Sequence, residues 1–204
     1  MAKKYFSPEE RNAVYKAIFS RRDIRMYRPT PVPVESLNRI LQAGHAAGSV
    51  GMMQPWNFIV LDDVAKRTQI HHHFVECNLR AAAVWKDEKK VHYGALKLQG
   101  ILDAPINIII TCDHSRGGTH VLGRHTIPET DVYSTCLAVQ NMWLSCYVNN
   151  VGSYWSTPAL KDDYAKHSGL NSNQKSLGFF FMGSYKHIES PKVREGLDSK
   201  VEWV

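Results

Sequence analysis

The sequence predicts a single domain in which helices flank a central sheet of about four strands, a sandwich of α and β elements. Helical and strand patterns alternate irregularly along the 204 residues, and no repeat, low-complexity tract or linker divides them. A chain of this length supports one well-filled core. Its apolar fraction of 44% and charged fraction of 22% are ordinary for a soluble globular protein.

The N-terminal part of the chain predicts two helices joined by an extended linker. Ser7 and Glu10 have the spacing of a capping box that begins the first helix. Apolar residues then recur on one face of that helix, at Val14, Ala17 and Ile18. Alternating prolines over residues 29–33 enforce the linker, and apolar positions over residues 37–44 indicate the second helix.

Four segments have the composition of strands. A loop rich in glycine and small residues leads into the first strand, residues 56–61. Residues 106–112 form a continuous β-branched run, which predicts a strand buried on both faces. Two more strands are predicted over residues 151–155 and 177–182.

The remaining segments predict helices and a C-terminal arm. Residues 64–103 are expected to be mostly helical, with a polar interruption around residues 86–93. Apolar residues recur at helical spacing over residues 132–147 with few charges between them, which indicates a central buried helix. A short helix is predicted over residues 158–167, and the arm covers about 188–204.

Charge and cysteine content narrow the class of protein. The formal charge of +6 favours anionic ligands, but no Lys/Arg run with interleaved aromatics indicates nucleic acid. No apolar run reaches the length of a membrane span, and the first residues lack the apolar core of a signal peptide. The four cysteines have no CxxC spacing and are expected to be buried in a reducing cytoplasm. We therefore expect a cytoplasmic protein with neither a nucleic-acid nor a membrane partner, and no zinc site.

The segment Arg21-Arg22-Asp23-Ile24-Arg25 carries the strongest chemical signal. Three guanidiniums within five residues suit a phosphate-bearing ligand, because each fork can bind phosphate through two hydrogen bonds. The alternative is a solvated basic helix end that faces the negative pole of the helix dipole. Asp23 would repel a phosphate, so it either neutralises an arginine or faces a different group.

The loop from Gly48 to Trp56 is a candidate site for a flat ligand. Its small residues let backbone N–H groups approach a ligand closely, and Gln54 can both donate and accept hydrogen bonds at a ring edge. A plain helix-to-strand connection is the alternative. No GxGxxG, GxxxxGK[ST] or GxSxG motif occurs, so a dinucleotide fingerprint, a P-loop and a serine hydrolase are not supported.

Two groups of histidines favour surface positions over metal binding. The side chains of residues 71–73 would point in different directions on a helix, and no carboxylate or cysteine stands at ligand spacing. The loop of residues 114–125 carries three more histidines and two arginines. Those histidines either line a pocket or lie exposed, and we favour exposure.

These segments together resemble the nitroreductase superfamily of flavin proteins, in which an RRSxR-type motif binds FMN and a QPW loop lies against the isoalloxazine ring. More narrowly, the chain is similar to the flavin-destroying branch of that superfamily, the 5,6-dimethylbenzimidazole synthases. The resemblance covers roughly residues 15–185. It rests on Asp23 within the arginine motif, the SVGMMQPWNF loop of residues 49–58, the ALKLQGI segment of residues 95–101 followed by Ala104-Pro105, and the VLGR segment of residues 121–124 with Ile127-Pro128, Asp131 and Tyr133-Ser134-Thr135.

The resemblance implies an α+β fold, a nitroreductase-like three-layer sandwich whose central, mostly antiparallel sheet is flanked by helices. It also implies an intertwined homodimer in which residues 1–204 form one FMN-binding domain. FMN would bind at the subunit interface, and the arm of about 188–204 would cross to the partner. The cofactor-binding residues implied are Arg21, Arg22, Arg25, Ser49, Met52, Gln54, Leu98 and Arg194.

The activity implied by the resemblance consumes the flavin. Reduced FMN would react with O2 to give 5,6-dimethylbenzimidazole, the lower ligand of vitamin B12, and erythrose 4-phosphate, while a separate flavin reductase would supply the reduced FMN. Asp23 would act as general base on a flavin or ribityl proton, a role that a serine hydroxyl cannot fill at neutral pH. A second catalytic group, a hydroxyl, corresponds to Ser156 or Thr157, because the chain departs there from the family's GWVSI pattern.

Two other functions stay open from the sequence alone. One is an NAD(P)H-dependent nitro- or enone-reductase that retains its FMN. Asp23 and the MQPWNF loop argue against this reductase, whereas the altered segment Gly152–Pro158 argues for it. The other is a non-catalytic flavin-binding protein, which is supported only if the altered segment has lost its function.

Overall fold

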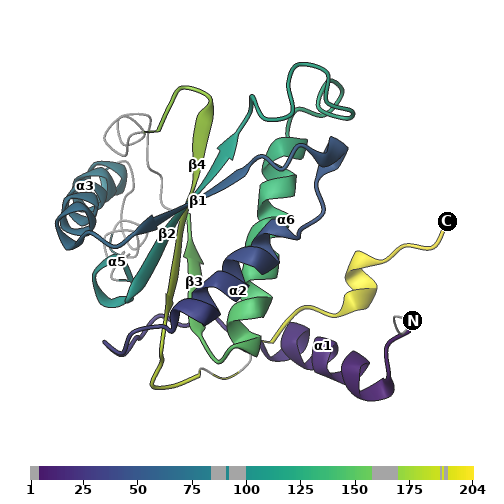
Figure 1. Cartoon of the computed structure of the whole chain (residues 1–204), viewed down its shortest axis with the longest axis horizontal. Coiled ribbons are helices and arrows are strands. Elements are labelled where there is room, and N and C mark those ends of the chain that lie inside the picture. Colours follow the sequence, from purple (N-terminus) through teal and green to yellow (C-terminus); the bar gives the residue numbers. More distant parts are fainter. Residues whose placement is uncertain (1–4, 84–90, 92–99, 158–169, 189, 191–192) are drawn as a thin grey trace.

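The central sheet contains four antiparallel strands in the order β1-β2-β4-β3 (Figure 1). The strands are β1 (Trp56–Leu61), β2 (Ile106–Asp113), β3 (Gly152–Ser156) and β4 (Gln174–Gly183). All four match the predicted strands to within three residues at either end. The structure, a computed structural model, describes residues 5–83, 91, 100–157, 170–188, 190 and 193–204.

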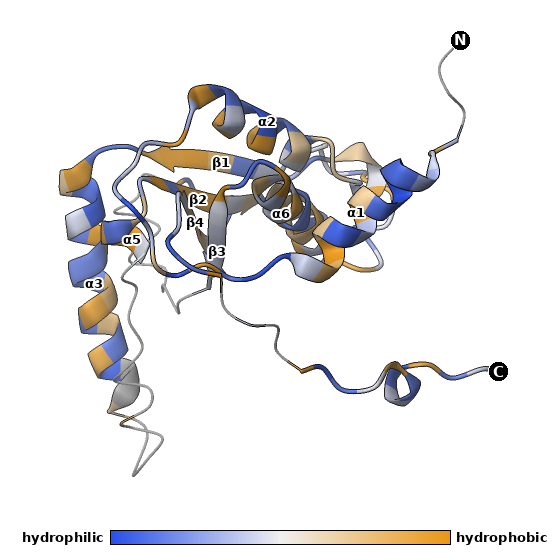
Figure 2. Ribbon diagram, turned by 90° about the horizontal axis from the view of Figure 1, so that it is seen from below, coloured by the Kyte–Doolittle hydropathy of each residue, from blue (hydrophilic) through white to orange (hydrophobic). Residues whose placement is uncertain are grey.

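Helices cover both faces of the sheet. Strand β2 carries isoleucines on both faces, and its neighbour β4 carries consecutive phenylalanines. Ile108, Ile110 and Phe180 pack against α2 (Val34–His45) and α6 (Thr130–Val148). Ile109, Phe179 and Phe181 face α3 (Val64–Ala82) and α5 (Gly100–Asp103), so the sheet is the middle layer of three (Figure 2). The prediction that the strand over residues 106–112 is buried on both faces is confirmed.

Helix α1 (Pro8–Ser20) begins as the sequence predicts. The Ser7 hydroxyl accepts a hydrogen bond from the Glu10 N–H, and the Glu10 carboxylate accepts one from the Ser7 N–H. Of the predicted apolar face, however, only Ala17 is buried. Val14 and Ile18 remain about half exposed, so this face of α1 has little to pack against within its own chain.

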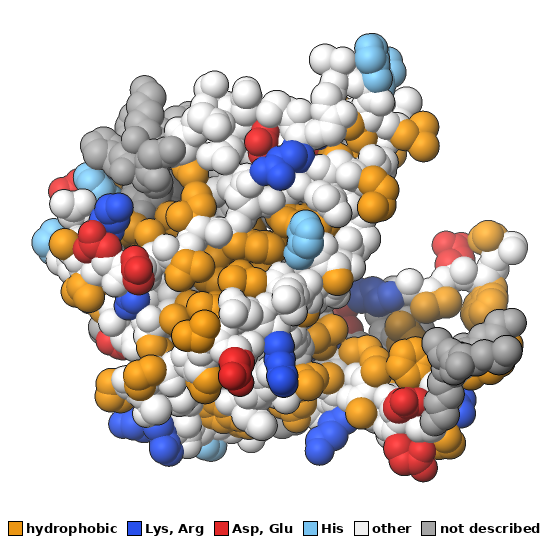
Figure 3. All heavy atoms as spheres, in the orientation of Figure 1, with side chains coloured by type: hydrophobic (Ala, Val, Ile, Leu, Met, Phe, Trp, Pro, Cys, Tyr) orange, Lys and Arg blue, Asp and Glu red, His pale blue; other side chains and the backbone are white. Residues whose placement is uncertain are grey.

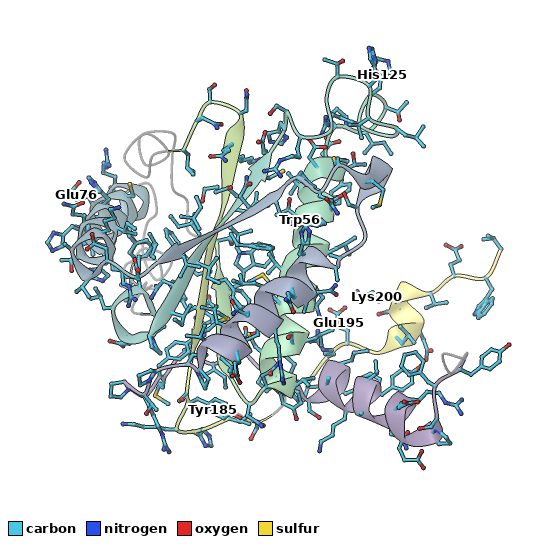
Figure 4. The ribbon with its side chains drawn as sticks, in the orientation of Figure 1. Trp56, Glu76, His125, Tyr185, Glu195 and Lys200 are labelled. Carbon is cyan, nitrogen blue, oxygen red and sulfur yellow. The ribbon has the colours of Figure 1, made fainter. Side chains whose placement is uncertain are left out.

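The C-terminal segment leaves the body of the protein as an arm. It contains one short turn of helix, η2 (Leu197–Lys200), steadied by an ion pair between Lys200 and Glu195 (Figure 4). Figures 1 and 2 show this arm projecting away from the sandwich. The arm exposes apolar side chains, including Val193 and Trp203.

Some predictions are corrected or fall outside the described residues. Cys112 and Cys146 are buried, but Cys77 and Cys136 are partly exposed, since each lies on the outer side of its helix. The predicted helix over residues 158–167 and the interruption around residues 86–93 fall largely outside the described part of the chain. Among the described helices, none combines the length and apolar character needed to cross a membrane.

Candidate functional site

The arginine segment runs beside the edge strand β3. After α1 ends, Asp23 forms a parallel bridge with Ser153, and the Ile24 N–H donates to the Ser153 carbonyl at 2.9 Å. Ile24 is buried in the core and anchors this segment. The arginines on either side of Ile24 are therefore held at the edge of the sheet.

Arg21 is fixed by an aromatic ring and by Asp23. Its guanidinium lies 4.2 Å from the centroid of the Trp143 ring on α6, within the range of a cation–π contact. Its Nη1 donates to Oδ1 of Asp23 at 3.1 Å. The sequence leaves two roles open for Asp23, and the structure shows one of them: the carboxylate neutralises an arginine.

Arg25 lies on the other face of β3. Its guanidinium is 3.8 Å from the centroid of the Tyr154 ring, which stacks on Phe181 on the α3 side of the sheet. Because successive strand residues point to opposite faces, the neighbouring Trp155 contacts Trp143 on the α6 side. Arg21 and Arg25 thus straddle the edge of the sheet.

Arg22 has a different environment from the other two arginines. Its Nη1 donates to the Phe19 carbonyl at 2.8 Å and to the Arg21 carbonyl at 2.6 Å. It therefore satisfies backbone carbonyls at the C-terminal end of α1, where a cation also interacts favourably with the helix dipole. The sequence left open that the arginines form a basic helix end facing the negative pole of the helix dipole. Arg22 has this position in the structure.

The loop between α2 and β1, residues 48–55, has an unusual backbone. Gly51, Met52 and Gln54 have φ angles of 56°, 51° and 47°, in the left-handed region. For the two residues that are not glycine, such a conformation costs about 1–3 kcal/mol each. The Gln54 N–H donates to the Ser49 hydroxyl at 2.8 Å, which closes the loop. We call residues 48–55 the flavin loop, after the ligand that the resemblance implies.

The flavin loop and the arginine segment contact opposite faces of α6. The Val50 N–H donates to the Ser134 hydroxyl at 3.2 Å, whereas Arg21 lies on Trp143. These two α6 residues are nine positions apart, which corresponds to two and a half turns, opposite sides of the helix and about 13 Å along its axis. A single chain therefore does not bring the two predicted halves of the site together.

The other predicted site residues are spread over the protein. Ser156 lies at the end of β3, about 10 Å along the strand from Ser153, the partner of Asp23. Thr157 is exposed directly after it. Arg194 is exposed on the arm, and Leu98 falls outside the described residues.

Sequence reasoning missed Trp143, Ser153 and Tyr154 as parts of this site. Trp143 and Tyr154 are the two rings that support the arginines. Trp143 occupies an apolar position in the helical pattern of residues 132–147, and that pattern predicts a core residue. In the described part of the chain its indole Nε1–H is buried without a hydrogen-bond partner. Such an unpaired buried donor is consistent with a bound group that supplies the missing acceptor.

A hollow of about 420 Å³ lies between α2 and β1 beside the flavin loop. Trp56 and Phe58 contribute apolar surface to it, and Gln54 and Arg116 contribute polar groups. The Trp56 Nε1 donates to Nδ1 of His45 at 3.2 Å, which fixes the ring at the start of β1 (Figure 4). Figure 3 shows apolar side chains gathered in a hollow of this face.

The three histidines of the 114–125 loop are exposed, as expected, whereas His71 and His73 on α3 are partly buried. His125 is exposed at the outer end of its loop, as Figure 4 shows, and His120 is exposed too. His114 is exposed as well, and its Nδ1 lies 3.0 Å from Oδ2 of the buried Asp131. Within the described residues, no group of three or more histidines, cysteines or carboxylates is placed to hold a metal ion.

The three-layer sandwich is the fold of a known class of oxidoreductases. The chain belongs to the nitroreductase family, whose sequence profile matches residues 18–184. Within that family it is similar to two 5,6-dimethylbenzimidazole synthases. The enzyme from Rhodospirillum rubrum is 36% identical over 150 residues, which cover 74% of this chain and 71% of the relative. The enzyme from Rhodobacter capsulatus is 31% identical over 72% of this chain and 71% of the relative.

A solved structure supports the same fold. The FMN-bound nitroreductase from Bacteroides fragilis superposes with a TM-score of 0.68 at 20% identity, covering 94% of this chain and 98% of that one. The predicted α+β nitroreductase-like fold and the predicted membership of this enzyme family are therefore confirmed.

Proposed function

We propose that this protein binds reduced FMN and, with O2, converts it to 5,6-dimethylbenzimidazole and erythrose 4-phosphate. The observation that carries the proposal is the placement of Asp23, which lies among three arginines at the edge of β3. The similarity to two 5,6-dimethylbenzimidazole synthases supports the same conclusion. Reduced FMN would supply both the electrons that reduce O2 and the carbon atoms of the product.

The residues of the arginine segment fit a phosphate-bearing ligand. Arg21 and Arg25 present guanidiniums at the sheet edge, and the buried Nε1–H of Trp143 has no hydrogen-bond partner among the described residues. We assign the phosphate and the ribityl oxygens to different members of this set, because Arg21 and Arg25 lie on opposite faces of the sheet edge, and Arg22 would contribute charge from the helix end. A phosphate would compete with Asp23 for Arg21, and this competition would release the Asp23 carboxylate to accept a proton from the ligand.

The flavin loop would hold the isoalloxazine ring. Its left-handed residues turn successive peptide groups, and Ser49 and Gln54 add side chains that can hydrogen-bond to a ring edge. Met52 is 76% exposed, so its side chain is available for contact with a ligand or a second subunit. Leu98 and Arg194 remain proposed contacts from the resemblance alone.

The active form would be a homodimer. The flavin loop and the arginine segment lie on opposite faces of α6, so each complete site needs one half from each subunit. The exposed apolar face of α1 and the exposed apolar side chains of the arm are surfaces that a second copy would bury. We propose that the arm crosses to the partner.

The second catalytic hydroxyl remains assigned to Ser156 or Thr157. Because Ser156 lies about 10 Å along β3 from the partner of Asp23, the two groups would act on different parts of the bound flavin. A separate flavin reductase would supply the reduced substrate.

One assay tests the proposal against its alternatives. The protein is mixed with FMN, a chemical reductant and air, and flavin loss and benzimidazole formation are followed by chromatography. Stoichiometric appearance of 5,6-dimethylbenzimidazole is the expected result. Intact flavin with steady NAD(P)H consumption on a nitroaromatic would instead establish a nitroreductase, the alternative favoured by the altered segment Gly152–Pro158. Intact flavin with neither activity would indicate a flavin-binding protein.

A further inference from the structure

The segment between β2 and α6, residues 114–129, forms a buried ion pair with α6 that the proposed site does not use. Asp131, in the first turn of α6, has a side chain only 1% exposed. Its Oδ1 accepts from Nε of Arg124 at 2.9 Å, and its Oδ2 lies 3.0 Å from Nδ1 of His114. A buried carboxylate is costly unless charge and hydrogen bonds satisfy both oxygens, and here both are satisfied.

Arg124 connects three parts of the chain through one guanidinium. Besides contacting Asp131, it donates from Nη1 to the Gly118 carbonyl at 2.9 Å and from Nη2 to the Arg116 carbonyl at 2.7 Å. The same Nη2 lies 3.2 Å from Sδ of Met53, a buried residue of the flavin loop. The guanidinium therefore joins α6, the 114–129 segment and the flavin loop.

The 114–129 segment and the flavin loop also pack closely against each other at two glycines. A Cβ built on Gly51 would lie 2.6 Å from Cγ1 of Val121, and one built on Gly123 would lie 2.8 Å from Cγ1 of Val50. Both glycines have positive φ angles. The two segments thus pack so closely that a shift of one displaces the other.

We propose that Arg124 and Asp131 are positioning residues for the flavin loop. Their ion pair holds the 114–129 segment against the loop and thereby maintains the left-handed backbone at Met52 and Gln54. Such a backbone persists only where its surroundings restrain it. The inference rests on the proposed function to the extent that flavin is the ligand of this loop.

Two variants of the ion pair test the proposal. Arg124→Lys keeps the charge but loses the fork that serves a carboxylate and two carbonyls at once, and Asp131→Asn removes the charge of its partner. We expect on the order of tenfold weaker FMN binding and tenfold slower turnover at saturating flavin, because small displacements of a binding group have effects of this size or larger. The visible circular dichroism of bound FMN should also change. Arg39→Lys, at an exposed position of α2, should behave as wild type.

A third variant perturbs the loop while leaving both charged residues in place. Gly123→Ala would push against Val50 and should change the affinity for FMN and its visible dichroism in the same direction. This variant decides the question if the ion-pair variants do not fold.

The measurements are made per folded molecule, with the folded fraction taken from far-ultraviolet dichroism and thermal unfolding. Wild-type affinity, turnover and bound-flavin dichroism in the folded variants would overturn the inference. A loss of thermal stability alone, with each folded molecule binding FMN as wild type does, would overturn it too. A wild-type protein that binds FMN but forms no benzimidazole would refute the proposed function, while the affinity and dichroism comparisons would still decide the positioning role.

Discussion

Asp23 would combine two electrostatic roles at one position, pairing with Arg21 and accepting a proton from the ligand. In the structure its carboxylate accepts from Arg21, whose guanidinium also lies on Trp143. The side chain of Asp23 is 42% exposed, so water and a ligand can both reach it. While Arg21 pairs with Asp23, the carboxylate is not free to accept a proton. Once the ligand phosphate binds Arg21, the Asp23 carboxylate would be free to act as a base. The pair would therefore couple substrate binding to proton transfer.

Replacing Asp23 with serine should leave FMN binding intact but slow flavin fragmentation. Asp23→Ser is expected to retain FMN, because Arg21, Arg22 and Arg25 remain, and to lower the rate of flavin fragmentation by about 10²–10⁴-fold, the typical contribution of a general base. The same substitution at Asp62, an exposed carboxylate after β1, serves as the control. Normal fragmentation by Asp23→Ser would show that the base assignment is wrong.

Cys146 should be chemically inert in the folded protein. It is fully buried on α6 beside Met182, and burial raises the pKa of its thiol to about 12. Since the thiolate is the nucleophile, we expect no alkylation of Cys146 by iodoacetamide at pH 8, whereas the partly exposed Cys77 reacts. Peptide mass analysis checks this result. Because the unfolded thiol ionises near pH 8.5 while the buried thiol stays protonated, the free energy of unfolding should fall as the pH rises from about 8.5 toward 12.

At the scale of elements, the junction of β3 and β4 depends on one glycine. Gly178 has a φ of 108° and pairs with Ile110, where a bulge shifts the β2–β4 register. A Cβ at this position would lie 2.1 Å from the Ser156 carbonyl oxygen. The end of β3 and the candidate hydroxyl at Ser156 therefore owe their placement to the absence of a side chain at Gly178.

Gly178→Ala should destabilise the protein far more than Gly118→Ala does. Both glycines have positive φ angles, but a Cβ at Gly118 meets no atom within 4 Å. We expect a loss of about 1–2 kcal/mol of unfolding free energy for Gly118→Ala, from the backbone alone. For Gly178→Ala the clash should add about 1–3 kcal/mol. Denaturant unfolding measures both values, and equal losses would mean that the strand edge moves aside without cost.

At the scale of the whole molecule, a single chain leaves sheet edges and apolar side chains uncovered. The sheet ends at β1 and β3, while α1 and the arm expose apolar residues that include Phe19 and Trp203. The two halves of the proposed flavin site lie on opposite faces of α6. The proposed homodimer would explain both observations, because a second copy would cover these surfaces and complete the site.

Removing the arm should weaken the dimer and the flavin site together. A chain that lacks residues 190–204 is expected to sediment as a monomer at concentrations where the full chain is a dimer, because it loses the exposed apolar residues of the arm. Its affinity for FMN should fall in parallel. Lys200→Ala, which removes only the ion pair with Glu195, is the control and should remain dimeric. An unchanged dimer after deletion would exclude the arm from the interface.

The local features of the fold could be predicted from the sequence. The capping box at Ser7, the strand buried on both faces over residues 106–112 and the apolar spacing of α6 are set by neighbouring residues and by helical or strand periodicity. The family motifs could be identified because they are short and contiguous. These features indicated an α+β flavin enzyme before any contact between distant residues was known.

The tertiary structure decided which residues meet. Periodicity could not indicate that Asp23 pairs with Arg21, that Trp143 supports this arginine, or that Arg124 joins Asp131 to the flavin loop. Nor could it show that the two halves of the site lie on opposite faces of α6. These outcomes depend on contacts between residues far apart in the chain, and only the packing of the sheet and helices determines them. The sequence by itself therefore determined the local elements and the family of this protein, whereas the tertiary structure decided the arrangement of its site.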